Sequence, residues 1–420
     1  MRDARSIRCT YYLESEIDPE RAAGILAGEQ SSGTFLPVPG ESARIRERHA
    51  AHVVGVEEFE QVRPTLPSRG NPEKVRAALA TIEFPMENVG TDLATLQTTI
   101  GGNLFELGEL FACRLQSMEL PDDLIEAHQG PAFGIEGTRR LIGDTQDAMI
   151  GTIVKPNVGL SAEEFRSVVS ELAMASIDVI KDDELMTSPD YLPLEQRVAI
   201  ATEEIARAEQ STGHRTMYAF NITGDLAGLR RRHDVVVAAG GRCVMLNIPI
   251  MGIPALSWLR TFSEVPIHGH RAGLAASMRS PGLGIDYTVW QQLVRLAGAD
   301  HVHVSGLGSK FYERDDEVAG NVRALLEPLG LTTLPLPVLS SGQNVTTPAL
   351  TYSSIPSTDV LMMAGGGVAA HPDGPGAGVH SLRQSWAAAV NGTPLVDAAD
   401  ELSAKGDHRL SHAIDMFGGR

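Results

Sequence analysis

The size and charge of the chain set the first limits on its function. Its 420 residues, 43% hydrophobic and 21% charged, predict a folded protein of two or three domains. A net charge of −18 disfavours nucleic acid and anionic membranes as partners. No apolar run is long enough to cross a bilayer, the N-terminus lacks the apolar core of a signal peptide, and Cys9, Cys113 and Cys243 form no metal-binding or disulfide pattern. We therefore expect a cytoplasmic protein.

The first 130 residues have the mixed pattern of a small α+β domain. Ser6–Leu13 alternates between apolar and polar residues as a strand does, and Asp18–Ala27 is helical with an Asp-Pro start. The turn at Gln129-Gly130-Pro131 marks a boundary. We therefore predict one domain over residues 1–130 and a second over residues 131–420.

From residue 150 onward, short apolar runs alternate with helical segments, among them Ala162–Ala175, Leu194–Gln210 and Tyr287–Ala297. Eight strand–helix units over about 250 residues predict a (β/α)8 barrel, an α/β fold whose chemistry lies at the carboxyl ends of its strands. A doubly wound open sheet is the alternative, but eight units fit closure better. The predicted strands are Gly151–Lys155, Asp178–Lys181, Met217–Asn221, Cys243–Asn247, Val265–His270, His301–Val304, Pro337–Ser340 and Asp359–Met363.

The most informative motif, Lys181-Asp182-Asp183-Glu184, stands at the end of the second predicted strand. Charges that leave water at such a place must be paired or must bind a metal. Strand alternation places Lys181 and Asp183 on one face, and carboxylate oxygens suit Mg²⁺. The lysine would repel that ion unless CO₂ converts its amine to a carbamate, a third anionic ligand. The alternative interpretation is a solvated acidic turn.

Lysine and histidine side chains follow other predicted strands. Lys155 can act as a base at a strand end, although a surface lysine before a turn is the simpler interpretation. The fifth and sixth predicted strands both contain His-x-His, at residues 268–270 and 301–303, and each pair places two imidazoles on one face. Because Arg271 adjoins the first pair, the sequence indicates a site for an anion such as phosphate.

Three glycine-containing segments follow the last three predicted strands. Ser305–Lys310 has the composition of a closing lid with a charged tip, or of a plain linker. Ser340–Gly342 and Gly365–Gly367 follow the last two strands, where many barrels bind phosphate. Their glycines allow backbone N–H groups to approach phosphate oxygens.

Together these motifs resemble the large subunit of ribulose-bisphosphate carboxylase, and more closely its non-carboxylating relatives, the RuBisCO-like proteins. The resemblance covers nearly the whole chain, in the family's motif order. It implies a ferredoxin-like N-terminal domain before the barrel and a homodimer with shared active sites, and leaves assembly beyond the dimer open. It also implies Mg²⁺ held by carbamylated Lys181, Asp183 and Glu184, with Lys155 as the proton-shuttling lysine.

The same resemblance implies the substrate-binding residues. His270 and the lid residue Lys310 fall at catalytic positions. Glu29–Phe35 resembles the segment that reaches into the active site of the partner subunit, and Gly102–Phe105 resembles the segment whose asparagine contacts substrate near the metal. The implied substrate and phosphate ligands are Glu29, Thr34, Asn103, Arg271, His303, Ser340, Gly342, Gly365 and Gly366.

Several positions depart from the carboxylase. Asn157 replaces the second lysine of the family's Lys-Pro-Lys, Phe35 replaces a tryptophan, Ser341 a glycine, and Asn247 an aspartate. These departures argue against ribulose-bisphosphate carboxylation. The metal motif and Lys155 are retained, which favours an enzyme that still enolises its substrate.

The retained Lys310 directs the functional hypothesis, because the lid lysine of the carboxylase steadies a CO₂-derived group. RuBisCO-like proteins of sugar catabolism cleave 3-oxo-isoapionate 4-phosphate by decarboxylation, or by carboxyl transfer and hydrolysis. We hypothesise this reaction on a phosphorylated sugar-derived substrate. The alternatives are the methionine-salvage enolase acting on 2,3-diketo-5-methylthiopentyl 1-phosphate and an isomerase of 5-methylthioribulose 1-phosphate.

Two other classes of protein remain as rivals. An amidohydrolase barrel also combines a carbamylated lysine with histidines and two metal ions, but normally carries His-x-His at its first strand. A binding role without catalysis fits less well with a complete set of metal ligands.

Overall fold

The structure is a computed structural model that describes residues 5–33 and 39–418. Its contacts divide the chain into two compact units. The first contains Met1–Gln129, Gly273–Ala297 and Leu329–Leu331, and the second contains the remaining residues. The units therefore do not follow a single cut in the chain. Among the described residues, no helix has the length and apolar character that crossing a bilayer requires.

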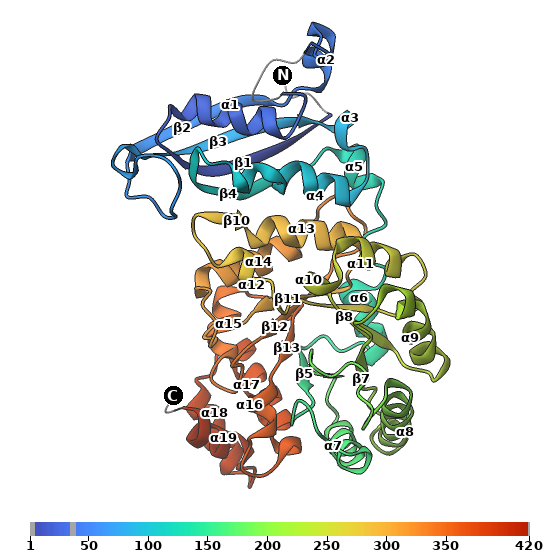
Figure 1. Ribbon diagram of the computed structural model, residues 1–420. Helices are drawn as coiled ribbons and strands as arrows, with labels where there is room; N and C mark the ends of the chain where they lie inside the picture. The colour runs from blue at the N-terminus through green and yellow to red at the C-terminus, as the bar shows by residue number, and fades with distance from the viewer. Residues whose placement is uncertain (1–4, 34–38, 419–420) are drawn as a thin grey trace. The chain divides into compact units, whose positions relative to one another are not determined.

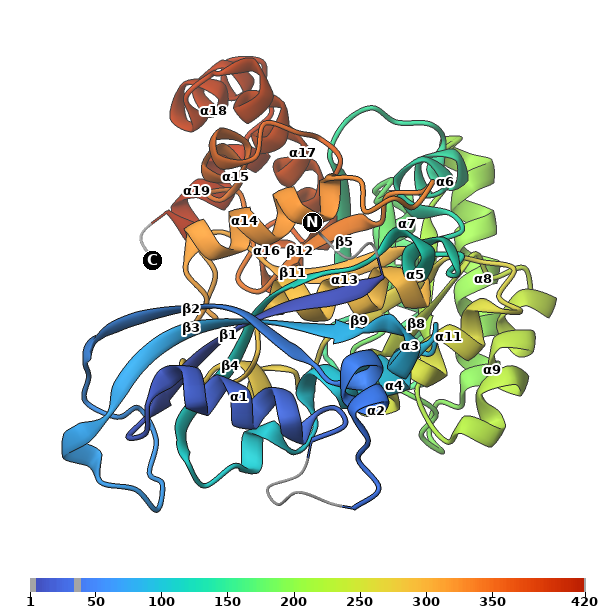
Figure 2. The same ribbon diagram turned by 90° about the horizontal axis from the view of Figure 1, so that it is seen from above.

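The N-terminal unit is built on a sheet with the strand order β10-β4-β1-β3-β2 (Figure 1). The pairs among β1 to β4 are antiparallel, as in a ferredoxin-like fold, whereas β10 joins β4 in parallel. Helix α1 lies on one face of this sheet (Figure 2). The strands are β1 Ser6–Ser15, β2 His52–Gln61, β3 Arg76–Pro85, β4 Leu110–Glu119 and β10 Leu283–Ile285.

Local chemistry explains the first two elements, and both confirm the sequence prediction. The inward side chains of β1 alternate as Ile7, Cys9, Tyr11 and Leu13, all buried. The Asp18 carboxylate accepts hydrogen bonds from the backbone N–H groups of residues 20 and 21 and so caps α1. The helices of this unit are α1 Pro19–Glu29, α2 Ala43–His49, η1 Pro72–Lys74, α3 Met86–Val89, α4 Leu93–Gly101, η2 Asn103–Glu106, α5 Asp122–Glu126, α12 Ala275–Met278 and α13 Tyr287–Ala297.

One helix with the predicted bounds belongs to an unexpected unit. Tyr287–Ala297 was expected as a barrel helix because it stands between two barrel strands. The structure places it in the N-terminal unit, together with β10, which was not predicted. The cause is a long-range contact, because the short strand β10 pairs with β4, which lies about 170 residues earlier in the chain. Hydrophobic periodicity covers only neighbouring residues and cannot predict such a pairing.

In the described part of the second unit, eight parallel strands close into a barrel, which confirms the predicted fold over the open-sheet alternative. Closure is made by β13 and β5, where Leu361 pairs with Met149 and Met363 with Gly151. The strands are β5 Met149–Ile153, β6 Val179–Lys181, β7 Met217–Asn221, β8 Cys243–Asn247, β9 Ile267–His270, β11 His301–Ser305, β12 Leu336–Ser340 and β13 Leu361–Met363.

The barrel encloses an apolar core and is covered outside by helices, with α7, α8 and α9 beside β5, β7 and β8 in Figure 1. Inward residues such as Met149, Val179 and Met245 fill the interior, and α6 adds Ile135 and Ile142. The helices are α6 Gly134–Ile142, α7 Ala162–Met174, α8 Leu194–Thr212, α9 Leu226–Ala238, α10 Ile248–Met251, α11 Ile253–Arg260, α14 Asp315–Leu326, α15 Pro348–Ser354, α16 Gly365–Ala369, α17 Pro375–Asn391, α18 Leu395–Ser403 and α19 Arg409–Phe417.

The first barrel strand is shifted two residues toward the N-terminus from its predicted bounds, Gly151–Lys155. Strand β5 begins at Met149 and ends at Ile153, so Lys155 follows the strand rather than ending it. Its ladder with β6 stops at the Ile153–Lys181 pair, and the following Pro156 has no backbone N–H to extend it. Lys155 therefore stands on a loop at the carboxyl end of the barrel, where its side chain can turn toward β6.

Candidate active site

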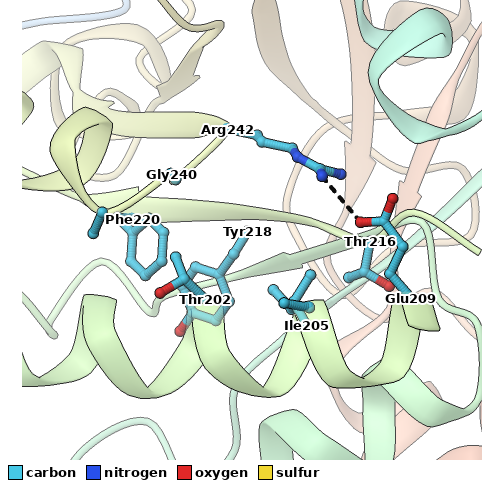
Figure 3. A pocket seen from close by; sticks show the side chains of 11 residues that line it. Thr202, Ile205, Glu209, Thr216, Tyr218, Phe220, Gly240 and Arg242 are labelled. Carbon is cyan, nitrogen blue, oxygen red and sulfur yellow. Dashed lines mark hydrogen bonds and ion pairs between the residues drawn. The ribbon is translucent and has the colours of Figure 1, made fainter. Parts of the chain in front are cut away.

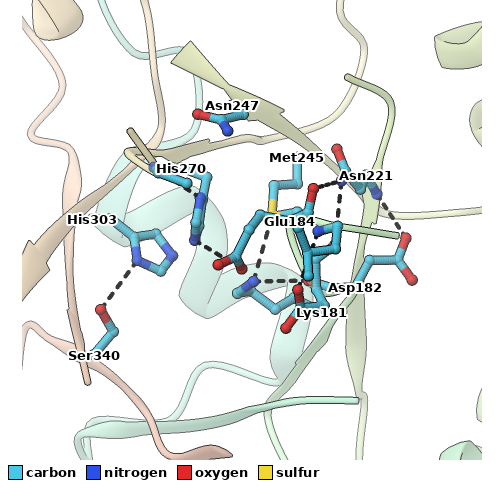
Figure 4. A network of polar contacts seen from close by, with 12 residues as sticks. Lys181, Asp182, Glu184, Asn221, Met245, Asn247, His270, His303 and Ser340 are labelled. Atoms are coloured by element: carbon cyan, nitrogen blue, oxygen red, sulfur yellow. Dashed lines mark hydrogen bonds and ion pairs between the residues drawn. The ribbon is translucent and has the colours of Figure 1, made fainter. Parts of the chain in front are cut away.

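Polar side chains gather where the barrel strands end. Lys181, Asn221, Asn247, His270 and Ser340 are the last residues of β6, β7, β8, β9 and β12 (Figure 4). Parallel strands of a closed barrel have their carboxyl ends on one face, and residues scattered through the chain meet there. These strand ends define the candidate active site.

Lys181 lies at the base of the site and is almost completely buried, with 1% of its surface exposed. Its Nζ donates to the backbone carbonyl of Asp182 at 2.8 Å and lies 3.7 Å from Sδ of Met245. Burial lowers the pKa of Lys181 to about 8, and the negative charges of Glu184 and Asp183 only partly offset that effect. A large share of the amine is therefore neutral at mildly alkaline pH, the form that reacts with CO₂.

Asp183 and Glu184 supply the carboxylate oxygens of the site. Oδ2 of Asp183 lies 3.1 Å from Nζ of Lys155, and Oε2 of Glu184 lies 3.6 Å from Nε2 of His270. Among the described residues, no three His, Cys, Asp or Glu side chains could hold a metal ion together. Asp183 and Glu184 thus place two carboxylates beside the buried amine of Lys181, with Lys155 and His270 in contact with them.

Asp182, between these residues, has a different role that sequence reasoning missed. Its carboxylate accepts a hydrogen bond from the hydroxyl of Tyr218 at 2.6 Å and forms a buried ion pair with Nε of Arg197 at 3.0 Å. It also accepts from the backbone N–H of Asn221 at 2.8 Å. The amide of Asn221 in turn donates to the carbonyls of residues 183 and 184, at 3.3 and 3.2 Å. This network fixes the backbone that carries Lys181, Asp183 and Glu184.

Lys155 connects three parts of the site. Besides the contact with Asp183, its Nζ donates to the side-chain carbonyl of Asn157. A Cβ atom at Gly365 would lie only 3.3 Å from Cε of Lys155, so this glycine leaves room for the lysine side chain. The residue that departs from the family motif, Asn157, is thus a direct partner of Lys155.

The histidines of β9 and β11 adjoin one another across the two strands. The rings of His270 and His303 have centroids 4.6 Å apart, and Nδ1 of His303 lies 3.3 Å from Oγ of Ser340. Burial lowers the pKa values of His268, His270 and His303 well below the usual 6.5. These imidazoles are therefore neutral at physiological pH.

The loop between β11 and α14 carries Lys310 and is anchored at two points. The Glu313 carboxylate accepts hydrogen bonds from both terminal nitrogens of Arg271, one at 2.9 Å and the other at 2.5 Å. The side-chain amide of Gln343 donates to the carbonyl of residue 307 at 3.1 Å. Lys310 itself is exposed, with its ammonium 5.9 Å from the ring centre of Phe311. Sequence reasoning identified Arg271 but missed its carboxylate partner, 42 residues away.

The turn after β12 has the backbone that a glycine pair would favour. Ser341 and Gly342 both have φ of +71°. The family glycine expected at residue 341 would adopt this conformation without strain, whereas serine adopts it at a cost. A Cβ at Gly342 would lie 3.3 Å from the backbone nitrogen of Lys310, so the turn and the lid loop are in contact. Gly365 and Gly366 begin α16 directly after β13.

The remaining predicted ligands lie elsewhere in the chain. Glu29 ends α1 and Asn103 begins η2, and both are exposed residues of the N-terminal unit. Thr34 and Phe35 lie outside the described residues. The second unit alone therefore brings together Lys155, Lys181, Asp183, Glu184, His270, Arg271, His303, Lys310, Ser340, Gly342, Gly365 and Gly366 at its strand ends.

A separate hollow of about 210 Å³ lies on the outer side of the barrel (Figure 3). Tyr218 and Phe220 of β7 line it with stacked rings whose centroids are 4.3 Å apart. An ion pair of 2.9 Å between Glu209 and Arg242 lies at its edge. The hollow contains none of the predicted site residues, and Tyr218 links it to the candidate site through the hydrogen bond to Asp182.

The fold and the site define a class of protein: a (β/α)8-barrel enzyme with a buried lysine and two carboxylates at the end of one strand. Comparison with known families agrees with this class. Residues 1–124 match the N-terminal domain of the ribulose bisphosphate carboxylase large chain, and residues 134–417 match its catalytic domain. The chain belongs to the RuBisCO large-chain family and is a RuBisCO-like protein.

Individual members of the family are similar to this chain over nearly its whole length. A 3-oxo-isoapionate-4-phosphate transcarboxylase/hydrolase of Xanthobacter autotrophicus is 44% identical over 396 residues, which are 94% of this chain and 96% of the relative. A 3-oxo-isoapionate-4-phosphate decarboxylase of Rhizobium etli is 40% identical over 98% of both chains. The crystal structure of a rubisco-like protein from Burkholderia fungorum has a TM-score of 0.91 and 40% identity, covering 98% of this chain and 100% of that one.

Proposed function

We propose that this protein is a Mg²⁺-dependent enzyme that cleaves the carboxyl group from 3-oxo-isoapionate 4-phosphate. The observation that carries the proposal is the pair of relatives, 44% and 40% identical over nearly the whole chain, whose names contain that substrate. The chain retains the residues that such a reaction needs: Lys181 with the carboxylates of Asp183 and Glu184, and Lys310 on the lid loop. Decarboxylation and carboxyl transfer with hydrolysis share the first step, breakage of the same C–C bond.

The metal site of the proposal is made by Lys181, Asp183 and Glu184. The neutral amine of Lys181 attacks CO₂, and the resulting carbamate loses one proton, which leaves an anionic oxygen ligand beside the two carboxylates. The buried lysine with its lowered pKa fits this reaction, and two carboxylates alone would not make a complete ligand set. When bound, Mg²⁺ supplies positive charge that stabilises the oxyanion formed from the substrate ketone.

The residues around the metal site would carry the proton and hold the substrate. As the C–C bond to the carboxyl group breaks, its electron pair moves toward the ketone and leaves an enolate. The Lys155 ammonium then returns a proton to the carbon that lost the carboxyl group, and its contact with Asp183 keeps it beside the site. Lys310, on the adjoining lid loop, would neutralise the departing carboxyl group.

The phosphate and the second subunit complete the proposal. Backbone N–H groups at Gly342, Gly365 and Gly366 would receive the phosphate, supported by their position after the last two barrel strands. By resemblance to the family, Glu29, Thr34 and Asn103 would contribute to the site of a partner subunit in a homodimer.

The test uses 3-oxo-isoapionate 4-phosphate labelled with ¹³C at the carboxyl carbon. The protein, preincubated with Mg²⁺ and bicarbonate, should release that carbon as CO₂ or bicarbonate, seen by NMR, and Lys181→Met and Lys155→Met should not. Absence of cleavage, with turnover of a methylthio-sugar phosphate instead, would refute the proposal and favour an enolase or isomerase. The two matched variants exclude a contaminating enzyme, because they are prepared identically.

A further inference from the structure

The last residue of β8, Asn247, faces the candidate site. In the parallel ladder between β8 and β9 it pairs with His270, and neighbours in such a ladder point to the same side of the sheet. Two residues earlier in β8, Met245 belongs to the barrel core, and its Sδ lies 3.7 Å from Nζ of Lys181. Because strand side chains alternate, Asn247 points into the same barrel, one layer closer to the strand ends (Figure 4).

The side chain of Asn247 is buried with one polar atom unpaired. Only 6% of the residue is exposed, and its side-chain oxygen Oδ1 is buried with no hydrogen-bond partner among the residues that the structure describes. The backbone is held in place, because its N–H donates to Oγ1 of Thr223 at 2.9 Å. The amide itself can still turn, since the last torsion of an asparagine side chain is broad.

Asn221, the last residue of the preceding strand β7, shows the contrast. Its amide nitrogen donates to the backbone carbonyls of residues 183 and 184, and its oxygen accepts from the backbone N–H of Thr223 at 3.1 Å. Both ends of that amide are therefore used inside the protein. At Asn247 the oxygen is not, and an unpaired buried carbonyl destabilises a fold, whereas a leucine of the same shape would not. Packing alone thus does not account for an asparagine at residue 247.

We propose that Asn247 is a substrate-binding residue whose amide pairs with a hydroxyl group of the sugar-derived substrate. A hydroxyl both donates and accepts, so it can pair with either end of a carboxamide. An anionic phosphate oxygen only accepts and would leave Oδ1 unpaired, and a thioether is a weak partner for both ends. This inference rests on the proposed function, because it takes the substrate to be a hydroxylated keto acid phosphate.

The contact would select between the proposed substrate and its rival. 3-Oxo-isoapionate 4-phosphate keeps hydroxyl groups of the sugar from which it derives, whereas the diketo form of 2,3-diketo-5-methylthiopentyl 1-phosphate has none outside its phosphate. A site with a buried hydrogen-bonding group disfavours an analogue that lacks the matching hydroxyl, because the group then stays unpaired. Asn247, one of the departures from the carboxylase, is then a specificity-determining residue.

The first test needs no substrate and measures thermal stability. Asn247→Leu replaces the amide by an apolar group of the same shape and should raise Tm by about 2 °C, because it removes an unpaired buried carbonyl. Asn247→Ala, which cannot crowd the site, should leave Tm at or above that of the wild type. Asn221→Leu is the matched variant and should lower Tm, since it removes three hydrogen bonds. A fall in Tm in both Asn247 variants would overturn the proposal, because the amide would then have a partner in the folded protein.

Kinetics test the contact with substrate. Asn247→Leu and Asn247→Ala should raise KM for 3-oxo-isoapionate 4-phosphate roughly tenfold, the loss of one hydrogen bond to a buried group, with a smaller change in kcat. Competitive inhibition by 2,3-diketo-5-methylthiopentyl 1-phosphate should stay within about twofold of wild type. An unchanged KM would show that the amide does not touch the substrate, and equal weakening of both ligands would show a general disturbance of the site. Either result would overturn the proposal.

Failure of the proposed function has a separate signature. The wild-type protein would then not cleave 3-oxo-isoapionate 4-phosphate, and the hydroxyl contact would fall with it. Cleavage by the wild-type protein together with an unchanged KM in both Asn247 variants would instead leave the proposed function standing and remove only the role of Asn247. The Tm comparison is independent of both, because it is made without substrate.

Discussion

The buried amine of Lys181 makes a quantitative prediction about activation by CO₂. Only the neutral amine reacts with CO₂, and burial lowers the pKa of Lys181 from 10.5 to about 8. At pH 8 about half of the amine is then neutral, compared with roughly one part in 300 for a lysine of unperturbed pKa. Burial should therefore raise the rate of carbamate formation at pH 8 by roughly 150-fold over that of an exposed lysine.

The assay follows carbamate formation by ¹³C NMR after addition of ¹³CO₂ at fixed dissolved CO₂ and fixed Mg²⁺. The initial rate should rise about tenfold per pH unit well below pH 8 and level off above it, because the amine is then already neutral. Parallel measurements of turnover should rise with the same dependence if the carbamate is needed for activity. The pH at half-maximal rate gives the pKa of Lys181 directly.

Two variants make the result specific. Lys181→Met keeps the length of the side chain without the amine and should lose the protected carbamate signal. Lys405→Met, which replaces an exposed lysine, should keep it. A rate that continues to rise about tenfold per unit between pH 8 and pH 10, as for a lysine of ordinary pKa, would refute the lowered pKa. A signal that persists in Lys181→Met would refute the assignment to this lysine.

Three further predictions follow from the site. Asp182→Asn leaves the buried charge of Arg197 without its partner and should lower the free energy of unfolding by about 3–5 kcal/mol in urea titrations. The control Asp316→Asn alters an exposed ion pair and should leave the urea midpoint nearly unchanged. Equal losses of stability in the two variants would contradict the anchoring role of Asp182. Lys155→Met should lower kcat at least about 100-fold with an unchanged circular dichroism spectrum, and activity within about twofold of wild type would remove Lys155 from proton transfer. Lys310→Met should slow C–C cleavage more than product proton exchange with D₂O, and equal slowing of both would indicate that the lysine only closes the loop.

The sequence alone determined the features that depend on local order. The apolar runs of the barrel, the helical segments between them and the residues that follow each strand can be read from neighbouring positions. The motif Lys181-Asp182-Asp183-Glu184 is contiguous, so a metal site could be predicted from it without the fold. The capped helix after Asp18 was predictable for the same reason, since its cap and first turn adjoin in the chain.

Tertiary structure alone decided which of these residues meet and what their surroundings do to them. Asp182 anchors the motif through Arg197 and Tyr218, and the sequence gives no sign that these three pair. Thr138 reaches His301 across 163 residues. The assignment of β10 and α13 to the N-terminal unit likewise depends on one long-range strand pair.

The physical reason is the range of each signal. Hydrophobic periodicity and capping act over a few residues, so they specify elements and their ends. Burial and hydrogen-bond partners arise only when distant elements pack, and they lower the pKa of Lys181. The candidate reactive residues could thus be predicted from the sequence, whereas the pKa of Lys181 depends on its burial in the folded barrel.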